Sequence, residues 1–234
     1  MTQITATYID HMGSDLSVVN AARVSFGKKS DWEFSALREG LLERDAKLIN
    51  YLAKHKHISP FGHAFASFHV KAPIFVARQL VKHKFLRWNE ISRRYVDDEP
   101  EFYMPEVWRG RSADKKQGSD GIVDLMSVGL EGRETYYKAQ YEENMLESVY
   151  NTYIHTNENY KAMLRAGVAP EMARMTLPQS TMTEWYWSGS LDAFADACRL
   201  RCKEDTQYET RLVADQISAK MSELFPVSWG CLME

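Results

Sequence analysis

Segments with the periodicity of strands alternate along this chain with segments that have the periodicity of helices, and this order limits the folds open to it. Apolar residues recur at every second position from Ala66 to Val70, which predicts a half-buried strand, and Pro73 then begins a predicted helix. From about Leu37 to Lys54 the apolar positions recur at helical spacing instead. Because these segments do not repeat as regular βαβ units, the sequence predicts an α/β protein of the α+β type. We expect a single domain over residues 1–234, with an antiparallel or mixed sheet and long helices.

The other expected elements follow from turn and cap signals. The basic residues after the helix expected at 74–83 run into an expected loop, LRWNEIS, at 86–92. Residues 106–124 are polar and contain glycine, so we expect a surface-loop insertion without chemistry of its own. The longest helix is expected from Arg133 to Leu164, with Gly167 as its C-terminal cap. Elsewhere we expect strands at 4–9 and 180–187, extended chain at 101–105, and helices at 170–177, 191–203 and 206–225.

The composition is that of an ordinary globular protein. Of the 234 residues, 44% are hydrophobic and 26% are charged, which suffices for one substantial core. The net charge of -3 argues against a protein that coats DNA or RNA, so no nucleic-acid partner is expected. Three cysteines without a framework spacing fit a reducing compartment. No apolar run approaches the roughly 18 residues needed to cross a bilayer. We therefore expect a cytoplasmic protein without a membrane partner.

Positive charge is concentrated in one segment, Arg78–Tyr95, which reads RQLVKHKFLRWNEISRRY. Six Arg or Lys residues and one His surround a single acid, Glu90. Because so many cations repel one another, the segment predicts an anionic ligand such as a phosphate or a carboxylate. A solvated basic face is the alternative, but Phe85, Trp88 and Ser92 place aromatic and hydroxyl groups among the charges. No Walker loop or GxGxxG motif occurs, so a dinucleotide would be bound outside a Rossmann fold.

The histidines and cysteines offer weaker signals. Five histidines stand between His55 and His83, but they form no HExxH motif and have no cysteine pair nearby, so no metal is expected. Cys198 and Cys202 share one helical face, yet no general base stands at a diagnostic spacing from either. We interpret both as small buried residues. The aromatic run Trp185–Trp187 is interpreted as packing in the core and at a subunit interface.

Several motifs resemble the flavin-dependent thymidylate synthase family in order and spacing. That family carries an Arg-His-Arg triplet followed, after seven residues, by a serine, and Lys82–Lys84 and Ser92 occupy those places here. Asn89–Glu90 and Arg94–Tyr95 complete the longer motif. The resemblance continues in AARVSF at 21–26, HISPFGH at 57–63, FHVKAPIFVARQ at 68–79, EMARMTLP at 171–178 and RLRCKEDTQYE at 199–209. Only residues 27–36, 106–124 and the extreme C-terminus fall outside it.

The resemblance implies the single-domain, non-Rossmann fold of that family and the conversion of dUMP into dTMP. FAD would carry a hydride, NADPH would reduce the flavin, and methylenetetrahydrofolate would supply the one-carbon unit, so dUMP and folate are expected partners. No enzyme cysteine attacks the pyrimidine in this family, in keeping with the context of the cysteines here. The family is a homotetramer with shared active sites, and our candidate interfaces are the strand around Trp185 and the helix from Arg133.

The resemblance also assigns roles position by position. Arg201 corresponds to an arginine held against the pyrimidine edge, where its guanidinium would stabilise negative charge as C5 becomes nucleophilic, and it is the expected catalytic residue. Ser92 is interpreted as a phosphate ligand because no base is placed to activate it. The expected dUMP ligands are Arg201, Gln79, Lys82, Glu90, Ser92, Arg94 and Arg174. The expected FAD ligands are His57, Ser59, Lys82, His83, Lys84, Asn89, Glu90, Ser190 and Asp196.

Some residues depart from the family pattern, and they bear on the choice of substrate and reductant. Lys82 and Lys84 replace arginines, which keeps the charge but loses the planar fork of the guanidinium. Arg87 replaces a small serine, and Asp205 stands where some members carry a histidine. Two other functions remain open. One is flavin-dependent C5 modification of another pyrimidine nucleotide such as dCMP, and the other is non-catalytic binding of nucleotides or nucleic acid.

Overall fold

The computed structural model describes residues 3–35, 38–113, 118–129 and 144–234. These residues form two compact units. The first comprises the N-terminal end as far as Gln3, Pro73–Phe75 and Ile91–Thr183, and the second comprises Ile4–Ala72, Val76–Glu90 and Glu184–Glu234. The expectation of one domain over the whole chain stays a prediction.

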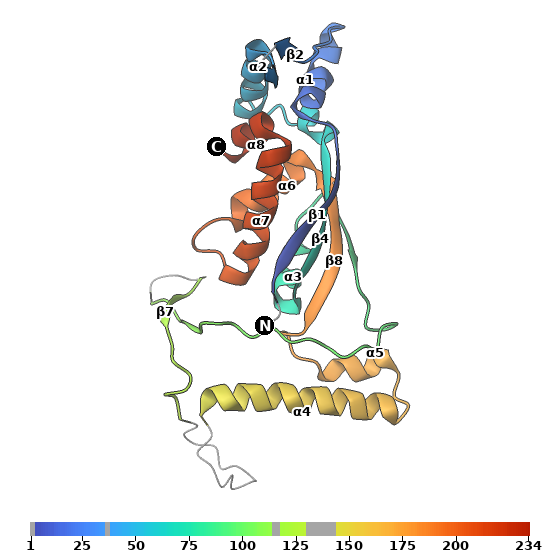
Figure 1. The fold of residues 1–234 in the computed structure, drawn as a ribbon, viewed down its shortest axis with the longest axis vertical. Coiled ribbons are helices and arrows are strands. Elements are labelled where there is room, and N and C mark those ends of the chain that lie inside the picture. The colour runs from blue at the N-terminus through green and yellow to red at the C-terminus, as the bar shows by residue number, and fades with distance from the viewer. Residues whose placement is uncertain (1–2, 36–37, 114–117, 130–143) are drawn as a thin grey trace. The chain divides into compact units, whose positions relative to one another are not determined.

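A four-stranded sheet is the centre of the second unit (Figure 1). Its strands, in spatial order, are β1 (Thr5–Met12), β4 (Phe65–Pro73), β8 (Met182–Ser190) and β5 (Leu86–Glu90). β1 is antiparallel to β4, and β5 is antiparallel to β8. Buried residues alternate with more exposed ones along β4, as the alternation of apolar residues predicted. The mixture of helices and antiparallel sheet confirms the predicted fold class.

Three helices, α6 (Leu191–Arg201), α7 (Tyr208–Leu224) and α8 (Pro226–Met233), lie along one side of this sheet (Figure 1). The Phe194 ring of α6 packs against Phe68 of β4 and Trp187 of β8, with ring centroids 5.4 and 5.5 Å apart. All three side chains are at most 2% exposed. Burial of a large apolar side chain stabilises a fold by about 1.5–3 kcal/mol. This cluster therefore anchors α6, the helix that carries Arg201, to the sheet.

The N-terminal part of the second unit is tied to its C-terminus by one buried carboxylate. Asp15, 3% exposed, accepts hydrogen bonds from the backbone N–H groups of Val227 at 3.0 Å and Ser228 at 2.8 Å, at the N-terminus of α8. The elements of this part are α1 (Asp15–Arg23), η1 (Val24–Phe26), β2 (Glu33–Ser35), β3 (Arg38–Gly40), α2 (Glu43–Lys54) and η2 (Ser59–His63).

The first unit is dominated by α4 (Met145–Arg165), whose two ends are both capped. The Asn144 side chain accepts from the Glu147 backbone N–H at 3.0 Å, and the Glu147 carboxylate accepts from the Asn144 N–H at 3.1 Å. At the other end Gly167, with φ +83°, adopts the left-handed cap predicted for it, and Val168 N–H donates to Met163 O at 3.0 Å. The helix expected at 170–177 begins at Pro170 as predicted, but α5 (Pro170–Ala173) passes into a 3-10 helix, η3 (Arg174–Thr176).

Several boundaries differ from the sequence expectations for identifiable reasons. The loop expected at 86–92 is wrong for its first five residues, which form β5. The helix expected from Leu37 begins at Glu43, because Arg38–Gly40 pair in β3. The last expected helix ends at Leu224, and Pro226, which lacks an N–H, opens the separate helix α8.

The connection expected at 106–124 has more structure than predicted. It contains β6 (Arg109–Gly110) and β7 (Asp120–Ile122), which pair antiparallel. The part of the helix expected between Arg133 and residue 143 lies outside the described residues. Across the part of the chain that the structure describes, no helix combines the length and the apolar character needed to cross a membrane.

Candidate functional site

Arg201, at the last position of α6, brings three of the expected site residues together. Its Nε–H donates to Nε2 of His83 at 3.0 Å, and its Nη2 donates to the backbone carbonyl of Gln79 at 3.3 Å. Gln79 lies on α3 (Ile74–Leu80), and His83 lies in the turn that follows this helix. The basic segment and the distant Arg201 thus meet within the second unit.

A tight turn between α3 and β5 presents His83 with Lys82 and Lys84 on either side. His83 N–H donates to Leu80 O at 3.1 Å, which closes the first part of the turn. Phe85 then adopts φ +65°, a left-handed conformation that costs a residue other than glycine about 1–2 kcal/mol. The Lys82 and Lys84 side chains are exposed, so two cations flank the half-buried imidazole.

Glycine at position 189 allows this turn to lie against β8. A Cβ atom at Gly189 would lie 2.5 Å from Leu86 Cδ2 and 3.1 Å from the Phe85 carbonyl oxygen. Both distances are shorter than ordinary contacts of a Cβ atom. Gly189, which has no side chain, therefore lets the chain at Phe85–Leu86 lie close to β8 without these contacts.

Burial lowers the pKa of both central groups, His83 and Arg201. Burial is the largest cause that lowers the pKa of His83, the Arg201 charge lowers it further, and Asp196 acts in the opposite direction. Burial also lowers the pKa of Arg201 from its ordinary value, although a guanidinium remains charged at neutral pH. A neutral His83 can accept the Arg201 Nε–H. The pair therefore combines a fixed cation with an uncharged imidazole.

Gln79 is held by residues that the sequence analysis did not single out. Its side-chain Nε2 donates to Oε1 of Gln207 at 2.6 Å, and Gln207 Nε2 donates to the carboxylate of Glu209 at 3.3 Å. Gln207 is the residue before α7, and Glu209 is only 2% exposed. Both lie in the TQYE end of a segment that the resemblance included, but nothing in their spacing indicated a contact with Gln79.

Glu90, at the end of β5, is held by an aromatic pair. The Trp88 indole N–H donates to a Glu90 carboxylate oxygen at 3.0 Å, and the Trp88 ring stacks on Trp185 of β8 with centroids 4.3 Å apart. Trp185 and Trp187 are at most 2% exposed, which confirms their interpretation as core residues, whereas Tyr186 between them is exposed. Asn89 is also exposed.

The remaining expected dUMP ligands lie in the first unit. Arg94 Nε lies 3.4 Å from the Ser92 hydroxyl oxygen, and the Arg94 guanidinium lies 4.9 Å from the Tyr95 ring centroid. Arg174, in η3, donates from Nε to Glu171 O at 3.2 Å and is exposed to solvent. The unit thus presents two exposed guanidiniums, one of them beside a hydroxyl group, which are suitable groups for binding a phosphate.

The expected flavin ligands of the second unit lie at the ends of several elements. His57 and Ser59 are exposed, and the His57 ring lies near those of Tyr51 and His55. Ser190 precedes α6 but makes no side-chain cap hydrogen bond to it. Asp196 forms an ion pair with Arg199 and contributes to the electrostatic field at His83.

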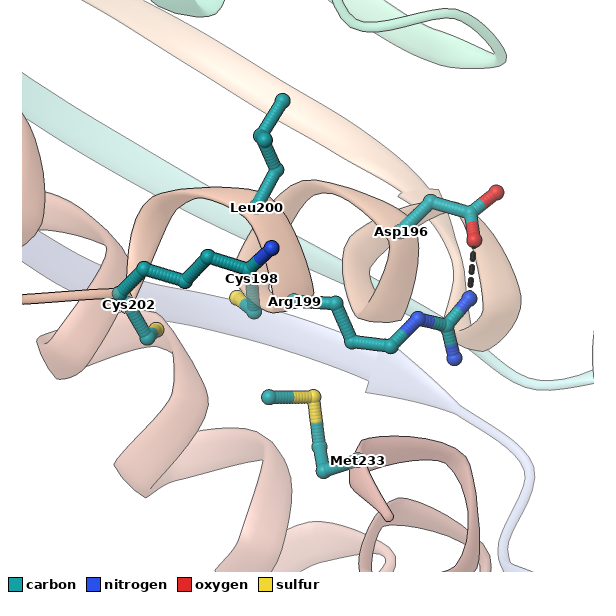
Figure 2. Close-up of a pocket in the computed structure, with 7 residues that line it drawn as sticks. Asp196, Cys198, Arg199, Leu200, Cys202 and Met233 are labelled. Carbon is teal, nitrogen blue, oxygen red and sulfur yellow. Dashed lines mark hydrogen bonds and ion pairs between the residues drawn. The ribbon is translucent and has the colours of Figure 1, made fainter. Parts of the chain in front are cut away.

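Two of the cysteines line a pocket formed by residues of α6, the two residues after it and Met233 of α8. The pocket has a volume of about 610 Å³ and is lined by Asp196, Cys198, Arg199, Leu200, Cys202, Lys203 and Met233 (Figure 2). A hydrogen bond with Cys202 is the largest cause that raises the pKa of Cys198, and burial raises it further. A thiol with a raised pKa is a weak nucleophile at neutral pH. Cys198 is buried as predicted, whereas Cys202 is half-buried.

The donor set suits a planar, anionic cofactor better than a metal. Lys82 and Lys84 offer exposed cations beside the His83 imidazole, and the Phe85 side chain that follows them is 82% exposed. Cations next to hydrogen-bonding and aromatic groups fit a flavin that carries a diphosphate. Within the described ranges, no group of three or more His, Cys, Asp or Glu residues could hold a metal ion.

Comparison with known proteins shows similarity over nearly the whole chain. The family described as thymidylate synthase complementing protein matches residues 7–227. A flavin-dependent thymidylate synthase of Thermus thermophilus is 39% identical over 227 residues, which are 97% of this chain and 74% of that protein. Another from Thermosipho melanesiensis is 35% identical over 218 residues, 93% of this chain and 85% of that protein.

Solved structures show the same similarity. The crystal structure of a UMP/dUMP methylase from Streptomyces cacaoi bound with 5-Br dUMP is 28% identical in sequence and has a TM-score of 0.76, covering 98% of this chain and 94% of that one. The same methylase bound with 5-Br UMP gives a TM-score of 0.77 over 99% of this chain and 94% of that one.

Proposed function

Because this chain belongs to the flavin-dependent thymidylate synthase family and is an enzyme of the methyltransferase class, we propose that it converts dUMP into dTMP. FAD is the proposed hydride carrier, NADPH the reductant, and methylenetetrahydrofolate the one-carbon donor. The observation that supports this function most strongly is the fixed Arg201, bound at once to His83 and to the Gln79 carbonyl. A merely anion-binding surface would not need a guanidinium held in this way.

The proposed chemistry assigns distinct tasks to the residues of the second unit. Arg201 binds the edge of the uracil ring and stabilises the negative charge that develops as C5 becomes nucleophilic. Neutral His83 holds Arg201 through its Nε2 and leaves the guanidinium as the positive group at this point. Lys82, Lys84, Asn89 and Glu90 would hold the flavin together with His57, Ser59, Ser190 and Asp196. When bound, the flavin supplies the hydride that completes the methyl group.

Phosphate binding is the proposed task of Ser92, Arg94 and Arg174. A hydroxyl and two guanidiniums can donate several charge-assisted hydrogen bonds to a phosphate dianion. We also propose the homotetramer with shared active sites that is typical of the family, in which residues of different copies would complete one site.

A uridine nucleotide other than dUMP is a second candidate substrate. The similar Streptomyces cacaoi protein is described as a methylase of both UMP and dUMP. Arg87 adds an exposed cation to β5 at a position where the family usually has a serine. Turnover of dUMP, UMP and dCMP measured side by side distinguishes these substrates.

Release of tritium from C5 of labelled dUMP, measured together with dTMP, tests the proposal. The FAD-loaded protein with NADPH and methylenetetrahydrofolate is expected to produce both. Arg201→Ala is expected to lower the rate by roughly 100-fold or more, in line with the loss of a group that stabilises charge in the transition state. Arg44→Ala, which removes an exposed arginine of α2, is the matched control and should retain the rate. A protein that binds FAD but yields neither product would contradict the proposal.

A further inference from the structure

A chain of hydrogen bonds leads from a buried carboxylate to Arg201. Glu209 accepts from Gln207 Nε2 at 3.3 Å, and Gln207 Oε1 accepts from Gln79 Nε2 at 2.6 Å. The Gln79 backbone carbonyl then accepts from Arg201 Nη2 at 3.3 Å, and Arg201 Nε donates to His83 at 3.0 Å. All five residues belong to the second unit. They connect the start of α7, the helix α3 with its following turn, and the end of α6.

The carboxylate at one end determines the orientation of both amides. An ionised carboxylate only accepts hydrogen bonds, so the group of Gln207 that faces Glu209 is its NH₂. The carbonyl oxygen of Gln207 consequently faces Gln79, and the NH₂ of Gln79 faces Gln207. Two glutamines alone could adopt either orientation. Glu209 is 2% exposed and lies in the first turn of α7.

We propose that Gln207 is a positioning residue for the nucleotide site, with Glu209 as its anchor. By fixing the Gln79 side chain, Gln207 keeps the end of α3, and with it the Gln79 carbonyl, against Arg201. Gln207 acts through these two residues and not by contact with the nucleotide. This assignment rests on the proposed function, in which Gln79 and Arg201 bind the pyrimidine nucleotide.

Exchanging the two side chains tests the assignment. Gln207→Glu places two carboxylates against each other next to a buried position, so the hydrogen bond to Glu209 is lost at neutral pH. The double change Gln207→Glu/Glu209→Gln restores the donor and acceptor order, because the amide introduced at 209 donates to the carboxylate introduced at 207, which accepts from Gln79. The double variant has the same composition as the natural protein, which separates the order of the groups from their identity.

The measurements are the dUMP dissociation constant of the FAD-loaded protein, by equilibrium dialysis across pH, and kcat/KM for dTMP formation. Gln207→Glu is expected to weaken dUMP binding roughly 10-fold or more above neutral pH, since it leaves a hydrogen bond unmade at a buried position. The loss should shrink on acidification, because a carboxyl pair that takes up one proton can again donate. The double variant should recover most of the affinity at all pH values.

Two controls and two outcomes complete the test. Gln3→Glu and Glu223→Gln make the same chemical changes at exposed positions and should leave dUMP binding unchanged. The assignment is overturned if Gln207→Glu binds dUMP as the natural protein does, or if the double variant remains as weak as the single one while its circular dichroism and Tm show that it is folded. If the natural protein itself neither binds nor converts dUMP, the proposed function fails and the assignment fails with it.

Discussion

Arg201 can donate its Nε–H to His83 only while the Nε2 atom of His83 carries a lone pair. The hydrogen bond of 3.0 Å therefore requires the neutral imidazole, which burial and the neighbouring guanidinium both favour. Asp196 is the charged group that acts in the opposite direction at this position. The charge state of His83 thus determines whether one of the two hydrogen bonds that hold the proposed catalytic arginine can form.

Acidification is expected to disrupt this pair. His83 has a pKa below its ordinary value of 6.5, so protons bind more readily to the unfolded chain than to the native protein as the pH falls below 6.5. The contribution of His83 to the free energy of unfolding is therefore intact above pH 6.5 and declines as the pH falls through the lowered pKa. The affinity for dUMP should decline over the same range, because protonated His83 repels Arg201.

His83→Gln tests this expectation, because a glutamine oxygen can accept from Arg201 but does not titrate. In this variant the affinity for dUMP should fall less on acidification, because the part of the fall that protonation of His83 causes is absent. Lys56→Gln, a change at an exposed position after α2, is the control and should keep the natural profile. If the affinity of His83→Gln for dUMP falls at low pH as much as that of the natural protein, another group causes the fall.

At the scale of elements, β5 and the turn before it present most of the basic segment. Leu86 and Trp88 alternate with Arg87 and Asn89, a period-two pattern that the charged residues obscured in the sequence. The strand pairs with β8 through the stacked Trp88 and Trp185 rings. Pairing with a distant strand, which a single sequence does not display, thus converted an expected loop into a strand.

Gly189→Ala is expected to displace this turn. The added methyl group would meet Leu86 Cδ2 at 2.5 Å and Phe85 O at 3.1 Å, so the Leu86 side chain must turn aside and the Phe85 carbonyl must shift by a few tenths of an ångström. Overpacking of this kind typically costs about 1–3 kcal/mol. Urea unfolding measures the loss, and FAD binding should weaken because Lys82–Lys84 move with the turn. The control is Gly129→Ala, which should have little effect because a Cβ atom at Gly129 meets open space. Gly27→Ala is unsuitable as a control because Gly27 has a positive φ. A Gly189→Ala protein of natural stability and flavin affinity would contradict this view of the turn.

Sequence reasoning predicted different parts of the site for different reasons. Gln79, His83 and Arg201 were expected from motifs shared with a family, and the structure brings them into contact. Gln207 and Glu209 were missed because their importance lies in hydrogen bonds that lead to a residue more than a hundred positions away, which no local spacing reveals. The roles of Ser92, Arg94 and Arg174, which lie in the first unit, remain predictions.

For the whole molecule, the sequence defined the class of fold better than its details. Periodicity predicted most of the helices and strands, and Gly167 and Pro170 predicted where α4 ends and α5 begins. The break between α7 and α8 at Phe225, and the short strands β2, β3, β6 and β7, depend on local pairing that periodicity does not detect. Similarity over residues 7–227 extends into both units, so both belong to one family.

We propose that this protein methylates dUMP without an enzyme thiol. Cys198 has a raised pKa, caused first by its hydrogen bond with Cys202 and then by burial, and burial also raises the pKa of Cys231. The most direct test follows carbon-13 from labelled methylenetetrahydrofolate into the methyl group of dTMP. It compares the natural protein with a variant in which Cys198, Cys202 and Cys231 are all replaced by alanine, both loaded with FAD and supplied with NADPH. Labelled dTMP and tetrahydrofolate from both proteins are the predicted result. The proposal is wrong if the natural protein yields no labelled dTMP. It is also wrong if the cysteine-free variant is folded and flavin-loaded but yields none.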